Sequence, residues 1–292
     1  MKTAGFTFIR NALKFDYPVV EAIRSVLPVC DHFVVAVGRS DDATLDLVRG
    51  IGSPKIRVLE TVWDDSLREG GRVLAAETDK AFQAIPPEFD WCFYIQADEC
   101  VHEQDLPHIR EQMLRYREDI DTEGFVLNYR HFYGSYDFVG ASRRWYRREV
   151  RIVRNDKQIR SYRDAQGFRW ADGRKLRVRP LKAHVHHYGW VKNPAAQQQK
   201  QLNFNRLWHS DEAVLQMVGQ TDTYQYDGSE PLERFVGSHP AVMQPRIAAM
   251  NWRFETDPTQ IRWTWKDRAS RFLENNFGWR PGEYRNFRLV ND

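Results

Sequence analysis

The sequence predicts an α/β protein built on a mostly parallel, doubly wound sheet flanked by helices. In the first hundred residues, short apolar runs alternate with amphipathic segments, and this order places successive parallel strands in one sheet. Cap and turn residues separate the segments and set the boundaries of each element. After residue 100, several runs alternate between apolar and polar positions, which predicts a mixed or antiparallel extension of the sheet.

Four strands and three helices are expected in the first half. The second strand is almost wholly apolar, which is typical of a strand buried on both faces of a sheet. The first helix begins near Pro18, the second follows the cap residue Asp42, and the third stops before Pro86. The strands are expected at residues 4–9, 32–37, 55–62 and 90–98, and the long third helix at residues 67–84.

The second half carries two further helices and the strands of the extension. Residues 219–246 have the Gly, Pro and Ser content of a long loop. The tail after residue 251 is rich in Trp and Arg, and we expect it to be helical. The expected helices are at residues 105–117 and 195–208, the latter rich in Gln, and the expected strands are at residues 124–131, 149–154 and 175–186.

Composition limits the function classes. The net charge of +3 is too small to predict nucleic-acid binding. The three cysteines do not suggest a disulfide framework, so we expect a reducing compartment and a cytoplasmic protein. No run approaches the roughly 18 apolar residues of a transmembrane span. A membrane contact would therefore be peripheral, at the inner face of the membrane.

The most informative segment ends in two adjacent carboxylates. Residues 90–95 have the composition of a buried strand, and the run ends at Asp98 and Glu99. Acidic residues are costly to bury unpaired, whereas open α/β sheets bind ligands at the carboxyl ends of their strands. Together with a divalent cation, Mn²⁺ or Mg²⁺, Asp98 would hold a diphosphate there. The alternative is a helix start, where carboxylates suit the first turn.

Three histidines lie within four positions, at His184, His186 and His187. In an extended segment the first two share one face and the third points to the other. We predict that they supply a metal ligand or a donor to phosphate, and an imidazole ligand favours Mn²⁺. Ordinary structural hydrogen bonding is the alternative.

An arginine cluster and two acids complete the set of chemical candidates. The density of the cluster predicts at least one contact with a phosphate or an acidic acceptor, and a solvated face is the alternative. Between the cluster and the histidines, a turn carries Asp164, a candidate general base for an acceptor. Glu149, inside the cluster, is its rival, with a salt bridge as the simpler role. The cluster contains Arg143, Arg144, Arg147, Arg148, Arg151 and Arg154.

In order and spacing, these segments resemble a glycosyltransferase of the GT-A type, family 2. The resemblance covers roughly residues 1–210. It is carried by Phe8-Ile9-Arg10-Asn11 after the first strand, Ser40-Asp41-Asp42-Ala43-Thr44 after the second, Arg72 in the long helix, Gln96-Ala97-Asp98-Glu99 after the fourth strand, and His187-Tyr188-Gly189-Trp190.

The resemblance implies a role for each of these positions. Asp98 is similar to the last acid of the family's Asp-x-Asp metal motif, and His187, or else His186, to the late histidine that completes the metal site. Asp164 lies where an inverting member places its catalytic base. The residues implied in donor binding are Phe8, Arg10, Asn11, Ser40, Arg72, Gln96, Ala97 and Asp98.

The implied activity is the transfer of a sugar from a nucleotide-diphosphate donor to an acceptor hydroxyl. Inversion, dependence on a divalent cation and a carbohydrate or glycolipid acceptor are implied, in the synthesis of surface polysaccharide or a glycoconjugate. Residues 1–210 would form the catalytic domain, with the nucleotide-sugar half up to about residue 100 and the acceptor half after it. Residues 211–292 would form a loop and a helical C-terminal extension. Whether the chain forms an oligomer is left open.

Two departures from the family pattern keep alternatives open. Gln96 stands where the motif has its first Asp, and Val37 and Gly38 stand where many members have an Asp that helps hold the nucleoside, so uridine is not implied. One alternative is a nucleotidyltransferase acting on a sugar phosphate, although residues 10–14 lack the glycines of its loop. The other is a non-catalytic carbohydrate-binding relative. A zinc hydrolase would want the His-Glu-x-x-His spacing, which is absent.

Overall fold

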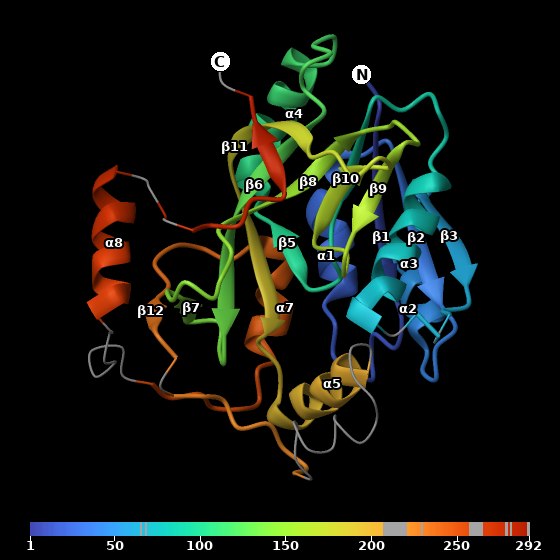
Figure 1. Cartoon of the computed structure of the whole chain (residues 1–292). Coiled ribbons are helices and arrows are strands. Elements are labelled where there is room, and N and C mark those ends of the chain that lie inside the picture. The colour runs from blue at the N-terminus through green and yellow to red at the C-terminus, as the bar shows by residue number, and fades with distance from the viewer. Residues whose placement is uncertain are drawn as a thin grey trace.

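The structure is a computed structural model that describes residues 1–64, 66–67, 69–206, 221–228, 230–256, 265–277, 280 and 282–290. One large mixed sheet forms the centre, with helices packed on both of its faces (Figure 1). This confirms the predicted α/β class.

The parallel half of the sheet contains the first strands of the chain. In the sheet they follow the order β3 (Ile56–Thr61), β2 (His32–Gly38), β1 (Thr3–Ile9) and β4 (Trp91–Tyr94), all parallel. The strand expected to reach Asp98 ends at Tyr94, because residues 95–98 turn away before β5 (Glu99–Val101) begins. Because Asp98 lies in this turn, its side chain does not have to follow the alternation of a strand.

The other half of the sheet is mixed, as predicted. Strand β8 (Arg148–Arg154) lies antiparallel between β4 and β6 (Gly124–Tyr133), and the long β11 (Leu176–Trp190) runs parallel to β6. Strand β5 pairs antiparallel with β11, which brings the acidic turn beside the histidines. The short strands are β7 (Phe138–Gly140), β9 (Ile159–Tyr162), β10 (Gly167–Trp170), β12 (Leu232–Arg234) and β13 (Phe287–Leu289).

Helices cover the sheet according to the alternation of its strands. Phe33 and Val35 of β2 face a core shared with α1 and α4, whereas Val34 and Ala36 face a core shared with α3. Helix α3 begins later than predicted, because Gly70 and Gly71 have φ values of 65° and 66° that interrupt a helix. The helices are α1 (Val19–Val26), α2 (Thr44–Arg49), α3 (Arg72–Gln83), α4 (Leu106–Arg115), α5 (Pro194–Arg206), α7 (Gln244–Ala248) and α8 (Trp265–Phe277).

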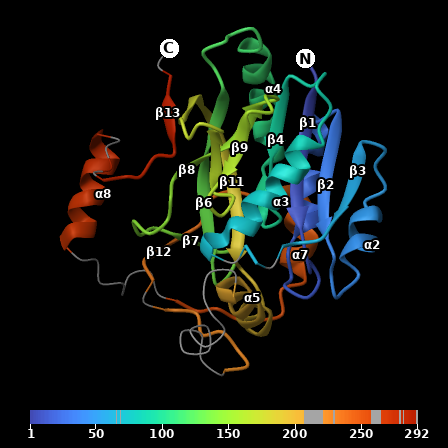
Figure 2. The same cartoon turned by 45° about the vertical axis from the view of Figure 1, so that its right-hand side comes forward.

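The C-terminal segments return to the sheet. Strand β12 pairs with β7, and β13 pairs with β11. The loop expected at residues 219–246 therefore contains β12 and α7, while residues 207–220, with the end of the predicted Gln-rich helix, lie outside the described residues. Figure 2 shows α5 beneath the end of β11, on the side of the sheet where β1 also ends. Within the described ranges, no helix has the length and apolar character to cross a membrane.

Candidate active site

A cavity of about 810 Å³ lies at the carboxyl ends of β1 and β4, the place where open α/β sheets bind ligands. Phe8 and Arg10 come from the end of β1 and residues 96–98 from the turn after β4, while α5 contributes Lys200 and residues 203–206. The aromatic side chains along the cavity are Phe8, Phe15, Tyr17, Trp63, Tyr146, Trp190 and Phe204. Flat apolar rings beside charged groups suit the binding of a base or a sugar.

The charged side chains that line the cavity favour an anionic ligand. The cations are Arg10, Lys200 and Arg206, and the carboxylates are Asp98 and Asp164. The positive side chains therefore outnumber the negative ones in the lining of this cavity. Phosphate groups are the anions that such arginine and lysine side chains recognise best in proteins.

The structure brings most of the predicted site residues to this cavity but not all of them. Phe8, Arg10, Gln96, Ala97, Asp98, Asp164 and His187 line it. Asn11, Ser40, Arg72, Glu149 and His186 do not line it. The backbone N–H of Asn11 donates to the Ser40 hydroxyl at 3.0 Å, so this pair joins the loops after β1 and β2. Arg72 is exposed at the start of α3.

A hydrogen bond from His187 to His131 determines which nitrogen of His187 is protonated and leaves the lone pair of its Nε2 facing the cavity. Nε2 of His131 lies 2.8 Å from the carbonyl of Tyr146, so this nitrogen carries a proton, and burial holds the pKa of His131 well below its ordinary value. Its Nδ1 therefore accepts the Nδ1–H of His187 at 3.0 Å. Burial also lowers the pKa of His187, which leaves its Nε2 unprotonated, 3.8 Å from Oδ2 of Asp98.

Positive groups surround Asp98. Lys200 donates from Nζ to Oδ2 of Asp98 at 3.2 Å and to the carbonyl of Gly189 at 2.8 Å. Lys192 is fully buried nearby and donates to the carbonyl of Asp16, and burial lowers its pKa to about 7. Burial alone raises the pKa of Asp98, but Lys200, which also donates a hydrogen bond to it, and Lys192 hold that pKa well below its ordinary value. Asp98 is therefore ionised at neutral pH.

The donor set does not fit a resident divalent cation as the side chains lie. Asp98 and His187 supply an oxygen and a nitrogen, but the group between Asp98 and the Gly189 carbonyl is an ammonium, which is not a ligand. No group of three or more His, Cys, Asp or Glu side chains suited to a metal occurs among the described residues. A cation would have to displace Lys200, and its presence stays a prediction.

His186 lies on the opposite face of β11 from His187. It accepts a hydrogen bond from Arg130 at 3.3 Å and stacks on Phe132 with ring centroids 5.7 Å apart. Burial, with Arg130 nearby, lowers its pKa to about 2. The alternation expected for an extended segment thus separates the two candidate ligands, and His187 is the one at the cavity.

Asp164 sits at the cavity on a backbone turn of unusual conformation. Its neighbours Arg163 and Ala165 have φ values of 57° and 63°, in the left-handed region that residues other than glycine rarely adopt. Such conformations collect at functional sites. Nε2 of Gln96 donates to the carbonyl of Ala165 at 3.1 Å, which ties this turn to the segment that carries Asp98. Burial raises the pKa of Asp164, which makes its carboxylate a stronger base.

The second acid of the Asp98–Glu99 pair is structural. Glu99 and Arg151 are both fully buried and form two parallel bonds of 2.8 and 2.9 Å. Glu99 also accepts the hydroxyl of Tyr129 at 2.7 Å and the backbone N–H of Gln96 at 3.1 Å. These bonds anchor the turn after β4 and hold Asp98 toward the cavity.

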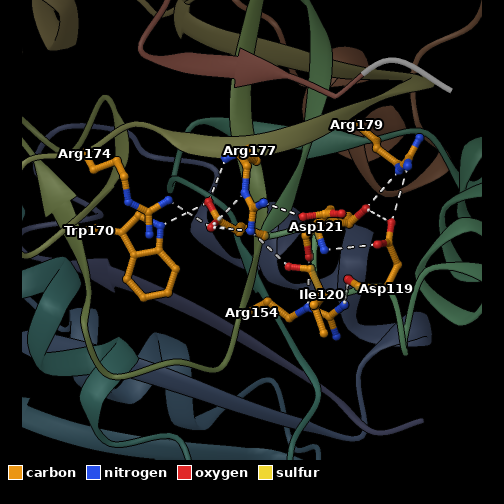
Figure 3. Close-up of polar contacts among 10 residues, drawn as sticks. Asp119, Ile120, Asp121, Arg154, Trp170, Arg174, Arg177 and Arg179 are labelled. Carbon is orange, nitrogen blue, oxygen red and sulfur yellow. Dashed lines mark hydrogen bonds and ion pairs between the residues drawn. The ribbon is translucent and has the colours of Figure 1, made fainter.

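The arginine cluster is mostly committed to structural contacts, and none of its members lines the main cavity. Arg154 donates to the carbonyls of Tyr116 and Asp119, and Figure 3 shows it beside residues 119–121. Figure 3 also shows Arg177 and Arg179, outside the cluster, gathered on residues 119–121. Arg143 and Arg147 line a second cavity of about 190 Å³, where the predicted contact with an anion stays a prediction.

Sequence reasoning missed Lys200, Lys192 and His131. Lys200 had one visible signal, since it is the only charged residue in the Gln-rich segment 194–205. Lys192 and His131 had none, because a single Lys after a strand or a single His within one is common. Their roles depend on which chain segments the fold brings together.

Glycine at position 189 provides the space beside Asp98. A Cβ there would lie 2.6 Å from Nε2 of His187 and 2.8 Å from Oδ2 of Asp98. We expect Gly189→Ala to displace both side chains and to weaken the binding of nucleoside diphosphates by about tenfold or more, which corresponds to roughly one charge-assisted hydrogen bond. Calorimetric titration would measure this. Gly228→Ala, which meets nothing within 4 Å, is the control, and unchanged affinity in Gly189→Ala would contradict the assignment.

Glu149 is buried behind the cavity and should make stability depend on pH. Burial raises its pKa to about 7, against 4.5 for an unburied glutamate. The folded protein thus binds this proton more tightly than the unfolded chain does. Its contribution to stability is complete below about pH 4.5 and is lost as the pH rises through about 7. The shift corresponds to about 3 kcal/mol.

We therefore expect Glu149→Gln to be less sensitive to pH than the wild-type protein. Between about pH 4 and pH 8, the wild type should lose about 3 kcal/mol more of its unfolding free energy than the variant. Urea unfolding at a series of pH values would measure the difference. Glu118→Gln, whose parent side chain is 88% exposed, is the control. Parallel pH profiles for wild type and Glu149→Gln would refute this.

The strand order, with antiparallel β8 inserted after β4 and a cavity at the strand ends, is that of the predicted α/β fold, a mostly parallel sheet with a mixed extension. No protein-family model matches the chain, and no curated protein matches it.

Solved structures similar to this chain share little sequence with it. S. aureus TarS has 12% identity and a TM-score of 0.42, over 74% of this chain and 42% of that one. Glucosyl-3-phosphoglycerate synthase from Mycobacterium tuberculosis, in complex with Mn²⁺, uridine diphosphate and phosphoglyceric acid, has 14% identity and a TM-score of 0.30, over 44% of this chain and 43% of that one. The chain thus spans less than half the length of both proteins.

A third similar structure is 4-diphosphocytidyl-2C-methyl-D-erythritol synthase from Anaerococcus prevotii, with 10% identity and a TM-score of 0.32, over 53% of this chain and 70% of that one. Likenesses at these TM-scores decide neither the reaction nor the substrate of this chain.

Proposed function

We propose that this protein is a glycosyltransferase that moves a sugar from a nucleotide-diphosphate donor to an acceptor hydroxyl. The observation that supports this best is one cavity at the strand ends that combines two charged side chains. They are Asp164, a carboxylate on a strained turn, and Lys200, an ammonium held on Asp98. The first is suited to take a proton from a hydroxyl, and the second to bind phosphate.

The reaction is a single displacement with inversion. The acceptor oxygen attacks the anomeric carbon of the donor while its proton passes to the carboxylate of Asp164. The bond from the anomeric carbon to the phosphate oxygen breaks, and the nucleoside diphosphate leaves with the electron pair. Arg10 and Lys200 line the cavity as cations that stabilise the charge on the leaving diphosphate.

The donor is placed along the ends of β1 and β4. Phe8, Arg10, Gln96 and Ala97 line the cavity on that side, and we assign them to donor binding. Asn11 and Ser40 support the site by joining the loops that follow β1 and β2. The backbone N–H of Asp41 donates to the side-chain oxygen of Asn11 at 2.8 Å, so each of the two loops donates one hydrogen bond to the other.

Asp98 and His187 are the residues that would hold Mn²⁺ or Mg²⁺ if Lys200 were displaced, and such a cation would supply positive charge to the diphosphate. We place the acceptor among carbohydrates and glycolipids, in the synthesis of surface polysaccharide or a glycoconjugate. Residues 1–210 form the catalytic domain in this proposal, acting in the cytoplasm at the inner face of the membrane.

A panel of sugar nucleotides tests the proposed reaction. The protein is incubated with UDP-, GDP-, dTDP- and ADP-sugars, or with nucleoside triphosphates and a sugar phosphate, in Mn²⁺ or in EDTA, and the free nucleotide, sugar and pyrophosphate are quantified. We expect slow hydrolysis of one donor, with release of a nucleoside diphosphate and no pyrophosphate. Pyrophosphate release from a nucleoside triphosphate and a sugar phosphate would identify a nucleotidyltransferase instead. Tight nucleotide binding with no turnover of any donor would identify a non-catalytic relative.

A further inference from the structure

Lys200 occupies a place that a metal ion would need. Its Nζ lies 3.2 Å from Oδ2 of Asp98 and 2.8 Å from the carbonyl of Gly189, and its side chain is only 12% exposed. The ammonium also lies 5.1 Å from the centre of the Tyr17 ring, at the distance of a cation–π contact. A carboxylate, a backbone carbonyl and an aromatic face thus hold one positive charge at the cavity wall.

A divalent cation and Lys200 would compete for the same oxygen. The carboxylate that lies 3.8 Å from His187 is the one that Lys200 already contacts, and two cations on one oxygen repel each other strongly in a site shielded from water. Lys192, whose Nζ lies 4.6 Å from the centre of the same Tyr17 ring, adds further positive charge when it is protonated.

The site therefore already has a cation of its own. Asp98 carries one negative charge, and Lys200 neutralises it through a direct bond, as a metal would. Lys200 retains one N–H group that can donate to a phosphate oxygen entering the cavity, because an ammonium has three donors and the structure assigns two of them to protein oxygens. The departure at Gln96 agrees with this, since an amide at that position gives a divalent metal no second carboxylate.

We propose that the ammonium of Lys200 takes the place of the divalent metal, so that a nucleoside diphosphate binds this cavity without one. This inference rests on the proposed function, because it names the group that meets the donor's diphosphate. The ligand is the diphosphate portion of a nucleotide, held by Lys200 and Arg10 on the wall of the cavity.

The role of Lys200 extends to helix α5. The same helix contributes Gln201 and residues 203–206 to the cavity wall, and the bond from Lys200 to Asp98 spans 102 residues of sequence. The bond therefore docks the helix on the turn after β4. A metal that displaced Lys200 would also release this wall from the site.

Calorimetry with and without metal tests the inference. UDP, GDP, dTDP and CDP are titrated into the full chain in EDTA and again in Mn²⁺, for the wild type, Lys200→Met and Lys200→Arg. Lys182→Met, on the exposed side of β11, is the matched control. We expect the wild type and the control to bind one nucleotide equally well in EDTA and in Mn²⁺. In EDTA, Lys200→Met should bind it at least tenfold more weakly, and Lys200→Arg should restore most of the affinity.

Binding of Mn²⁺ alone, followed by electron paramagnetic resonance, gives a second readout that needs no nucleotide. Lys200→Met should bind Mn²⁺ at least tenfold more tightly than the wild type, because the ammonium no longer occupies the position beside Asp98. Equal Mn²⁺ affinity in the two proteins overturns the inference, as does wild-type nucleotide binding that EDTA abolishes. The latter result leaves the proposed function standing. Absence of nucleotide binding in every condition would instead overturn the proposed function, while the Mn²⁺ comparison still decides the role of Lys200.

Discussion

Replacing Asp164 with Asn should lower the rate of sugar transfer by about 10²–10⁴-fold and leave the affinity for the nucleotide unchanged, because an amide has the shape of the carboxylate but cannot accept a proton. The backbone turn at Arg163 and Ala165 should persist, since it does not depend on the charge of the side chain. Initial rates under saturating donor, together with calorimetric titration of the nucleotide, would separate the two quantities.

Asp172→Asn, in an exposed turn, is the control for the same chemical change. A fully active Asp164→Asn variant, with an inactive Glu149→Gln variant, would show that Glu149 is the base. The structure favours Asp164 between the two, because Asp164 lines the cavity, whereas Glu149 is 2% exposed and bonds the backbone N–H of Val150. A base must reach the acceptor hydroxyl, and a carboxylate enclosed by the protein cannot.

Replacing Arg151 with Met should destabilise the protein by about 3–5 kcal/mol, because it leaves the Glu99 carboxylate buried without its partner. Both side chains are fully buried, and two hydrogen bonds join them. The expected loss is a large fraction of the stability of a typical domain. Thermal and urea unfolding, monitored by circular dichroism, would measure it.

An exposed ion pair supplies the control for Arg151. Arg49 and Glu60 form a bond of 2.8 Å, but their side chains are 55% and 63% exposed, so Arg49→Met should cost no more than about 1 kcal/mol. The double variant Arg151→Met with Glu99→Leu should recover much of the lost stability, since it removes both charges together. A single variant as stable as the wild type would show that Glu99 finds another partner or takes up a proton.

The turn after β4 explains how a single acidic pair serves both structure and function. Glu99 begins strand β5 and turns inward to Arg151, while Asp98 precedes the strand and turns to the cavity. Gln96 contributes from the same turn, through its bond to the segment that carries Asp164. In the proposed reaction, Gln96 would thus be a positioning residue that links the segments carrying Asp98 and Asp164.

The order of the elements was predictable because it depends on local patterns. Apolar periodicity, caps and glycines lie within a few residues of each boundary, and the parallel strands, the mixed extension and the position of Asp98 follow from them. The separation of His186 from His187 was also predictable, since neighbouring side chains on a strand point to opposite faces. The end of the fourth strand was placed too late, because the strand composition continues to Ile95 beyond the last paired residue, Tyr94.

The sequence by itself determined the α/β class, the edge of the sheet that carries the main cavity, and the acid and imidazole that face it. Only the tertiary structure decided that Lys200 contacts Asp98, that His131 orients His187, and that Arg151 neutralises Glu99. The physical reason is distance along the chain. Hydrophobic periodicity acts over a few residues, whereas these contacts join segments that are 102, 56 and 52 residues apart and meet only when the sheet has formed.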